Sequence, residues 1–168
     1  MSMLNMRNKN YLPNEFGDGC FGCSPDNSNG LQMKFEADQD TVVSNLTVPK
    51  HLCGWNGLIH GGVITTILDE IMSWSAIHLL KKLVMTKTMT VDFINPLHVG
   101  DDLTAKGRIL KVSSRHEAVI EGFLSNSDNE ICAKSEGIFA TFSPKVAIRL
   151  GIIKDERAKW LSELLGSN

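Results

Sequence analysis

The chain has 168 residues, a formal net charge of −2 and 42% hydrophobic residues. This length suits one domain that buries about two-thirds of its unfolded surface, and the near-neutral charge, with no long basic block, gives little support to nucleic-acid binding. The N-terminus lacks the apolar core of a signal peptide, and acidic and hydroxyl residues interrupt the longest apolar stretch. We therefore expect a cytoplasmic protein without a membrane span.

The first half of the chain predicts a hairpin followed by a long helix. Residues 1–19 are polar and are expected to form a flexible N-terminal segment. Residues 31–36 alternate apolar and polar side chains as a half-buried strand does, and residues 42–48 read as its hairpin partner. A long apolar helix is predicted over residues 62–80. Two lysines follow it, and their positive charge is favoured at a helix C-terminus.

After the helix the hydrophobic period changes from 3.6 to 2 residues, which is typical of strands. Strands are predicted over 86–93, 103–112, 117–125 and 131–142. The polar residues 127–130 separate the last two strands, which are therefore predicted to form a hairpin. About six mostly antiparallel strands around one long early helix define an α+β domain. We place this domain at residues 20–143, followed by a C-terminal extension, 144–168, with a short amphipathic helix over 155–165.

Cys20 and Cys23 have the C-x-x-C spacing of a zinc knuckle or a redox pair. A structural zinc site needs four ligands, and no second C-x-x-C or C-x-x-H follows in the sequence. The expectation is free thiols in a tight glycine-containing loop and no metal, with metal binding and redox use as the alternatives.

Asp69 is the residue of the long helix that most strongly indicates a site. At 100° per residue it shares a face with small or hydroxylated residues, whereas the expected core residues, Ile64, Leu68, Ile71 and Leu79, occupy another. The face of Asp69 is formed by Gly62, Thr65, Thr66, Ser73 and Ala76. Such a strip suits a cleft or a close subunit contact. Glu70, beside Ile67 and Trp74, is expected to be a spectator.

The start of this helix suits a polarised carbonyl, because its first N–H groups have no partner within the helix. Gly62 and Asp69 are seven residues apart, or roughly 10 Å along an α-helix. A donor and a carboxylate acting on one carbonyl must both lie within about 3–4 Å of it. If both act on one carbonyl, they come from two antiparallel helices, which predicts a dimer with shared sites.

His60-Gly61-Gly62 followed by Asp69 resembles the hot-dog-fold acyl-CoA thioesterases, in particular the phenylacetic-acid-degradation (PaaI-like) branch. The resemblance covers about residues 20–142, and its motifs also include Cys20-Phe-Gly-Cys23, Asn29-Gly-Leu31, Gly57-Leu-Ile-His-Gly-Gly62, Leu68-Asp-Glu70 and Phe93-Ile-Asn-Pro-Leu-His-Val-Gly-Asp101. It implies a curved antiparallel sheet of five to six strands around a central helix. It also implies a homodimer or homotetramer with sites at the dimer interface.

The resemblance also implies roles for individual residues. Asp69 is expected as general base or nucleophile, and the Gly62 N–H as the group that polarises the thioester carbonyl. His60 and Gly61 shape the turn, and Thr86 stands where related enzymes carry a Ser or Thr that positions water. A close branch has an asparagine six residues before the His-Gly-Gly motif, where this chain has Gly54. Asn56, four residues before the motif, is the remaining candidate for an asparagine that contributes to the oxyanion site.

The expected activity is hydrolysis of an acyl-CoA to a carboxylic acid and free CoA, without a cofactor. Arg115, in a Ser-Ser-Arg-His turn, is a candidate contact for the CoA phosphates, and Ser73 on the strip of Asp69 a candidate substrate contact. Two alternatives remain: a non-catalytic acyl-CoA sensor, and an enoyl-CoA hydratase or dehydratase on the same scaffold.

Overall fold

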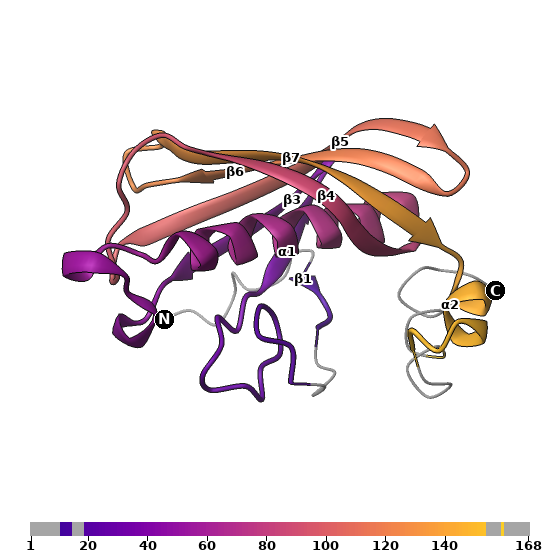
Figure 1. The fold of residues 1–168 in the computed structure, drawn as a ribbon, viewed down its shortest axis with the longest axis horizontal. Helices are drawn as coiled ribbons and strands as arrows, with labels where there is room; N and C mark the ends of the chain where they lie inside the picture. The colour runs from indigo at the N-terminus through magenta and orange to yellow at the C-terminus, as the bar shows by residue number, and fades with distance from the viewer. Residues whose placement is uncertain (1–10, 15–18, 154–158, 160–168) are drawn as a thin grey trace, which may run out of the picture.

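The computed structural model describes residues 11–14, 19–153 and 159. Within them, one antiparallel sheet of seven strands, in the order β1-β2-β3-β5-β6-β7-β4, lies along one side of a long helix (Figure 1). The elements are β1 (Tyr11–Leu12), β2 (Phe35–Asp38), β3 (Thr41–Thr47), the 3₁₀ turns η1 (Lys50–Leu52) and η2 (Trp55–Gly57), α1 (Gly61–Leu80), β4 (Leu83–Phe93), β5 (Asp102–Ser114), β6 (Glu117–Ser125), β7 (Ile131–Phe142) and α2 (Pro144–Arg149).

This architecture confirms the α+β fold class expected from the sequence. The bounds of β6 and β7 coincide with the predicted strands, and β4 and β5 are longer than predicted. The sheet contains more strands than the expected five to six because β1 adds a short strand beside β2.

The predicted strand over 31–36 is only partly correct. The expected alternation of buried side chains is present, since Leu31, Met33 and Phe35 are all buried. Gln32, however, has a positive φ of 48°, which breaks the extended backbone. Ladder pairing with β3 starts only after this point, at Glu36 opposite Val43. The first part of the segment therefore packs its side chains without joining β3 in the sheet.

The two ends of the chain differ from the sequence expectations where they are described. Tyr11 and Leu12 pair with β2, and Leu12 is buried, so this part of the segment expected to be flexible is anchored. At the other end Pro144 begins α2, which Ser143 caps by accepting a hydrogen bond from the Val146 N–H. Most of the helix predicted over 155–165 lies outside the described residues.

A pair of glycines lets α1 approach the sheet closely. Gly107 of β5 and Gly122 of β6 are direct partners in the ladder. A Cβ atom on Gly107 would lie 2.4 Å from Ser75 Oγ and 2.8 Å from the Ile71 carbonyl oxygen, and one on Gly122 would lie 3.0 Å from Met72 Cγ. The helix thus rests in a trough that carries no side chains.

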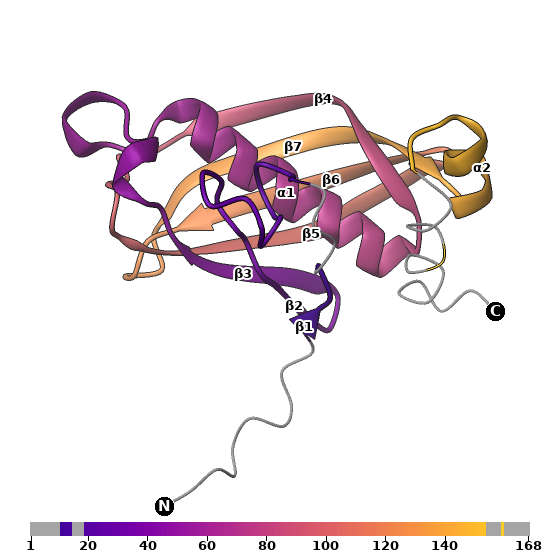
Figure 2. The same ribbon diagram turned by 90° about the horizontal axis from the view of Figure 1, so that it is seen from below.

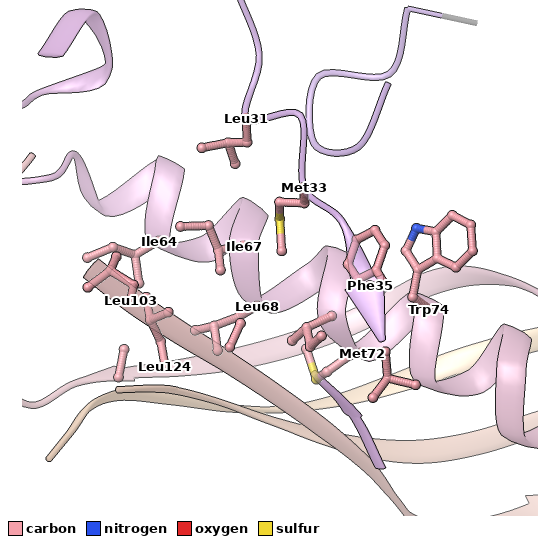
Figure 3. Packing of buried hydrophobic residues seen from close by; sticks show 14 of the residues in the cluster. Leu31, Met33, Phe35, Ile64, Ile67, Leu68, Met72, Trp74, Leu103 and Leu124 are labelled. Carbon is pink, nitrogen blue, oxygen red and sulfur yellow. The ribbon is translucent and has the colours of Figure 1, made fainter. Parts of the chain in front are cut away.

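The opposite side of α1 is covered by residues 31–35, which lead into β2. Figure 3 shows Met33 and Phe35 approaching the helix from this side, and the Phe35 ring stacks on Trp74 with 4.8 Å between ring centroids. By length and composition α1 is apolar enough to cross a membrane, but half of that window is buried inside the protein. Packed on both sides, α1 is the core helix of this domain.

Strand β4 forms one edge of the sheet. It pairs with β7 on one side only, and Figure 2 shows it running beside the helix at the border of the sheet. Among its eleven residues, Met85 is 50% exposed and Phe93 57% exposed. A long edge strand with exposed apolar side chains presents unpaired N–H and C=O groups to another chain.

Candidate active site

The His-Gly-Gly sequence forms the N-terminal cap of α1. His60 is the N-cap residue, in extended conformation, and its Nδ1 accepts a hydrogen bond of 2.9 Å from the Gly62 N–H. The carbonyl of His60 accepts hydrogen bonds from the N–H groups of Val63 and Ile64. The imidazole thereby satisfies one of the donors that a helix start leaves without a partner.

This cap determines which backbone N–H can donate a hydrogen bond to a substrate carbonyl. The expected donor, the Gly62 N–H, is already bonded to the His60 ring. Within the described part of the chain, no acceptor bonds the Gly61 N–H. The Phe93 ring lies over Gly61, where a Cβ would be 3.7 Å from it. The amide available without rearrangement is therefore that of Gly61, one residue earlier than expected.

Asp69 and Thr86 lie together. The Thr86 hydroxyl on β4 donates a hydrogen bond of 2.6 Å to Asp69 Oδ1 on α1. The pairing of β4 with β7 shifts register between Thr86 and Thr88, and such irregularities redirect a side chain. Asp69 itself is only partly exposed. A carboxylate thus stands next to the edge strand with one oxygen fixed by a hydroxyl.

The strip around Asp69 differs from expectation at one position. Ala76 is fully buried, whereas Thr65, Thr66 and Ser73 are half-buried. On the helical wheel it stands between Asp69 and Met72, so it faces the strands on which the helix rests. Ser73, one turn after Asp69, is half-buried on the same strip as expected.

Glu70 is not a solvated spectator. It lies under the loop that contains the two neighbouring cysteines, with 3.4 Å between Cys20 Sγ and Glu70 Oε1. Burial, and then the charge of Cys20, raise the pKa of Glu70 to about 8. The sequence carried a signal for this, because a carboxylate next to Ile67 and Trp74 on the helical wheel lies on an apolar stripe.

Among the described residues, no hydrogen bond or ion pair joins Asn56 or Arg115, the remaining candidates, to Asp69. Asn56 lies in η2 with φ 49° and is exposed. Arg115 follows β5, and its carbonyl accepts a hydrogen bond of 2.8 Å from Lys82 Nζ just beyond the C-terminal end of α1. Thirteen residues, roughly 20 Å at helical rise, separate Asp69 from Lys82. Within one chain Arg115 therefore does not converge on Asp69.

The aromatic residues near α1 divide between core and surface. Trp74 is buried against Phe35 and belongs to the core. Trp55 is 89% exposed in the loop before the helix. The described chain also has two hollows of about 410 and 560 Å³, which lie on the sheet face away from α1 and do not include Asp69.

Residues 56–133, a segment that contains His60, Asp69 and Thr86, match the model of the thioesterase superfamily. The match covers just under half of the chain, and over this segment the chain is similar to that superfamily.

Solved structures at this level of similarity show a shared fold. The Escherichia coli PaaI protein from the phenylacetic acid degradation operon aligns with a TM-score of 0.61 at 20% identity, covering 67% of this chain and 81% of that one. A Streptococcus mutans protein solved with bound acetyl-CoA aligns with a TM-score of 0.61 at 20% identity, covering 66% of this chain and 89% of that one.

A Xenopus laevis protein named acyl-coenzyme A thioesterase THEM4 is 28% identical over 94 residues. The alignment covers 56% of this chain and 42% of that protein, so the chain spans less than half the length of this relative.

Proposed function

We propose that this protein hydrolyses the thioester of an acyl-CoA to a carboxylic acid and free CoA. The observation that carries the proposal is the Asp69 carboxylate, held 2.6 Å from the Thr86 hydroxyl beside the edge strand. The match of residues 56–133 to the thioesterase superfamily supports it, as do the name of the Xenopus relative and the acetyl-CoA bound to the Streptococcus protein.

In the proposed reaction the Asp69 carboxylate removes a proton from water, whose oxygen attacks the carbonyl carbon of the thioester. Thr86 fixes one carboxylate oxygen and leaves the other for the water. When the carbon–sulfur bond breaks, the proton held by Asp69 passes to the departing CoA thiolate. Direct attack by Asp69 on the same carbon requires the same placement of the carboxylate.

The developing oxyanion requires a hydrogen-bond donor at the start of α1. The Gly61 N–H supplies one without rearrangement, whereas the Gly62 N–H first has to leave the His60 ring. Removal of such a donor commonly costs about 3 kcal/mol of transition-state stabilisation. Gly61→Pro removes the N–H at a position where the extended backbone of His60 tolerates a following proline.

One helix does not supply both groups to one carbonyl. Gly61 and Asp69 are eight residues apart, or about 12 Å of helix. We therefore propose a homodimer, in which the start of α1 of one subunit faces Asp69 of the other. The open edge of β4, next to Asp69, offers the pairing surface. A homotetramer built from two such dimers keeps the same site.

An assay of thiol release with a panel of acyl-CoA substrates tests the activity. We expect turnover by the wild type and a 10²–10⁴-fold lower kcat for Asp69→Ala with the assembly intact. Asp92→Ala is a matched control, because Asp92 is an exposed carboxylate that pairs with Lys134 on the sheet. Enoyl-CoA hydration without thiol release would instead show a hydratase, and binding without turnover a sensor.

Mixing two inactive variants tests whether the site is shared. Asp69→Ala and Gly61→Pro chains are inactive alone, but each heterodimer contains one site with both wild-type groups. Random mixing of equal amounts restores about a quarter of the wild-type activity for a shared two-fold site. No recovery after verified subunit exchange would place both groups in one chain.

We also propose which residues contact the CoA ester. Arg115 and Lys82 lie together at the end of α1 away from His60, and we assign them to the CoA phosphates. Asn56 and Ser73 are assigned to the acyl-pantetheine portion of the substrate. Arg115→Ala is expected to raise KM for the CoA ester with little change in kcat.

A further inference from the structure

The loop that covers α1 is firmly anchored around its two cysteines. The Leu31 N–H donates to the Phe21 carbonyl at 2.9 Å, and the Met33 N–H donates to the Gly22 carbonyl at 3.0 Å. The Asn14 side chain adds a hydrogen bond of 2.8 Å to the Cys23 carbonyl. These contacts fix the backbone of the C-x-x-C segment from outside.

The two thiols and Glu70 converge on one point. The Sγ atoms of Cys20 and Cys23 and a carboxylate oxygen of Glu70 all lie within 4.8 Å of one another. Cys20 Sγ and Glu70 Oε1 are 3.4 Å apart. With Zn–S bonds of about 2.3 Å and a Zn–O bond of about 2.0 Å, a tetrahedral ion places such a pair of ligand atoms about 3.5 Å apart.

The loop and the helix approach each other most closely at Gly22. Gly22 has to be a glycine, because its Cβ would lie 2.3 Å from Glu70 Cγ. The loop and the helix thus come close enough for one ion to bridge them.

Glu70 contributes a carboxyl group to the cluster. Among the described residues, no lysine or arginine forms an ion pair with Glu70. Two thiols and a carboxyl group are groups that bind a divalent cation when they give up their protons.

We propose that Cys20, Cys23 and Glu70 bind one Zn²⁺ ion, with water as the fourth ligand. Two thiolates and one carboxylate suit zinc, which accepts sulfur and oxygen ligands in tetrahedral geometry. The ion ties the 19–33 loop to the face of α1 that Glu70 occupies. This site differs from the Asp69 site, and the proposal stands whether or not the protein hydrolyses thioesters.

The test uses the full chain, reduced and stripped of metal by a chelator, with zinc or cobalt alone as the probe. We expect one equivalent of metal per chain and a rise of the melting temperature with zinc. Co²⁺ is expected to give a thiolate charge-transfer band and the visible bands of tetrahedral coordination. Absence of stoichiometric binding would overturn the proposal.

Four variants locate the site. Cys20→Ser and Cys23→Ser are expected to abolish the charge-transfer band or halve its intensity, with zinc affinity lowered by at least about tenfold. Glu70→Gln keeps both thiols and is also expected to weaken zinc binding by at least about tenfold, because the third ligand is lost. Cys53→Ser removes an exposed thiol outside the cluster and is the matched control. Unchanged affinity in Glu70→Gln would rule out the three-ligand site.

Alkylation of the wild-type protein gives a readout that needs no variant to fold. Zinc is expected to protect Cys20 and Cys23 from iodoacetamide, as measured on their peptide by mass spectrometry, while exposed Cys53 reacts equally with and without metal. Oxidised glutathione serves as a second treatment. A Cys20–Cys23 disulfide in a chain that shows no zinc protection would make the pair a redox couple and overturn the metal site.

Discussion

Asp69 and Glu70 are consecutive carboxylates on one helix, yet they lie in opposite kinds of surroundings. Asp69 points toward the edge strand β4 and accepts a hydrogen bond from the Thr86 hydroxyl. Glu70, turned by 100°, lies under the cysteine loop, where burial raises its pKa to about 8. The segment that covers each carboxylate, rather than the residue type or the helix, therefore decides the surroundings of that carboxylate.

The two carboxylates also differ in the partners that we propose for them. Asp69 stands beside an edge strand, and its proposed partners are a substrate and a second subunit. Glu70 lies next to two thiols of its own chain, and its proposed partner is a cation. A single helical turn therefore carries a proposed shared site on one face and a proposed metal site on another.

Exchanging each carboxylate for its amide tests the comparison most strongly. Asp69→Asn keeps the shape but removes the base, and we expect kcat to fall 10²–10⁴-fold in the thiol-release assay. Glu70→Gln is expected to change kcat less than about tenfold while it weakens zinc binding. Equal losses of activity in the two variants would make the division of roles between the two faces wrong.

Gly22→Ala tests how closely the loop and Glu70 have to meet. The added Cβ would lie 2.7 Å from Glu70 Oε1, so the carboxylate has to move. We expect a loss of about 1–3 kcal/mol in the free energy of unfolding, measured by urea denaturation.

A double-mutant cycle identifies the source of that loss. If the clash is with Glu70, the Gly22→Ala/Glu70→Ala protein loses less stability than the sum of the single variants. Additive losses would place the strain elsewhere in the loop.

Thr86→Val has the smallest expected effect. It keeps the volume and the branched side chain of β4 but removes the hydroxyl bonded to Asp69. A hydrogen bond to a charged group contributes about 1.5 kcal/mol, which corresponds to about a tenfold lower kcat. Thr86→Ser retains the hydroxyl and is expected to stay near the wild type. Equal activity of the valine and serine variants would remove Thr86 from the site.

Much of the fold follows from the sequence because its signals are local. The change of period from 3.6 to 2 marks the passage from α1 to the strands, and the bounds of β6 and β7 follow from alternation and a polar turn. The strand predicted over 31–36 is only partly correct, because burial against a helix and burial in a sheet produce the same alternation of apolar and polar side chains. Only the positive φ at Gln32 separates the two, and it has no clear signal in the residue type.

The site was predictable where it depends on one helix and not where it depends on loops. Helical geometry placed Asp69 on a polar strip, and helical rise separated it from the helix start. The hydrogen bond between His60 and Gly62 arises from a side-chain rotamer, which spacing does not encode. The meeting of Glu70 with Cys20 joins residues fifty positions apart, and no period in the sequence links them.

The trough formed by Gly107 and Gly122 has a consequence for how this protein tolerates change. Because α1 rests on strand backbone there, the height of the helix above the sheet is set by atoms common to every residue. Large side chains elsewhere in the core are therefore exchangeable as long as total volume is kept. In a scan of all substitutions, we expect these two strand positions, which contribute no side chain at all, to be among the least tolerant in the sheet.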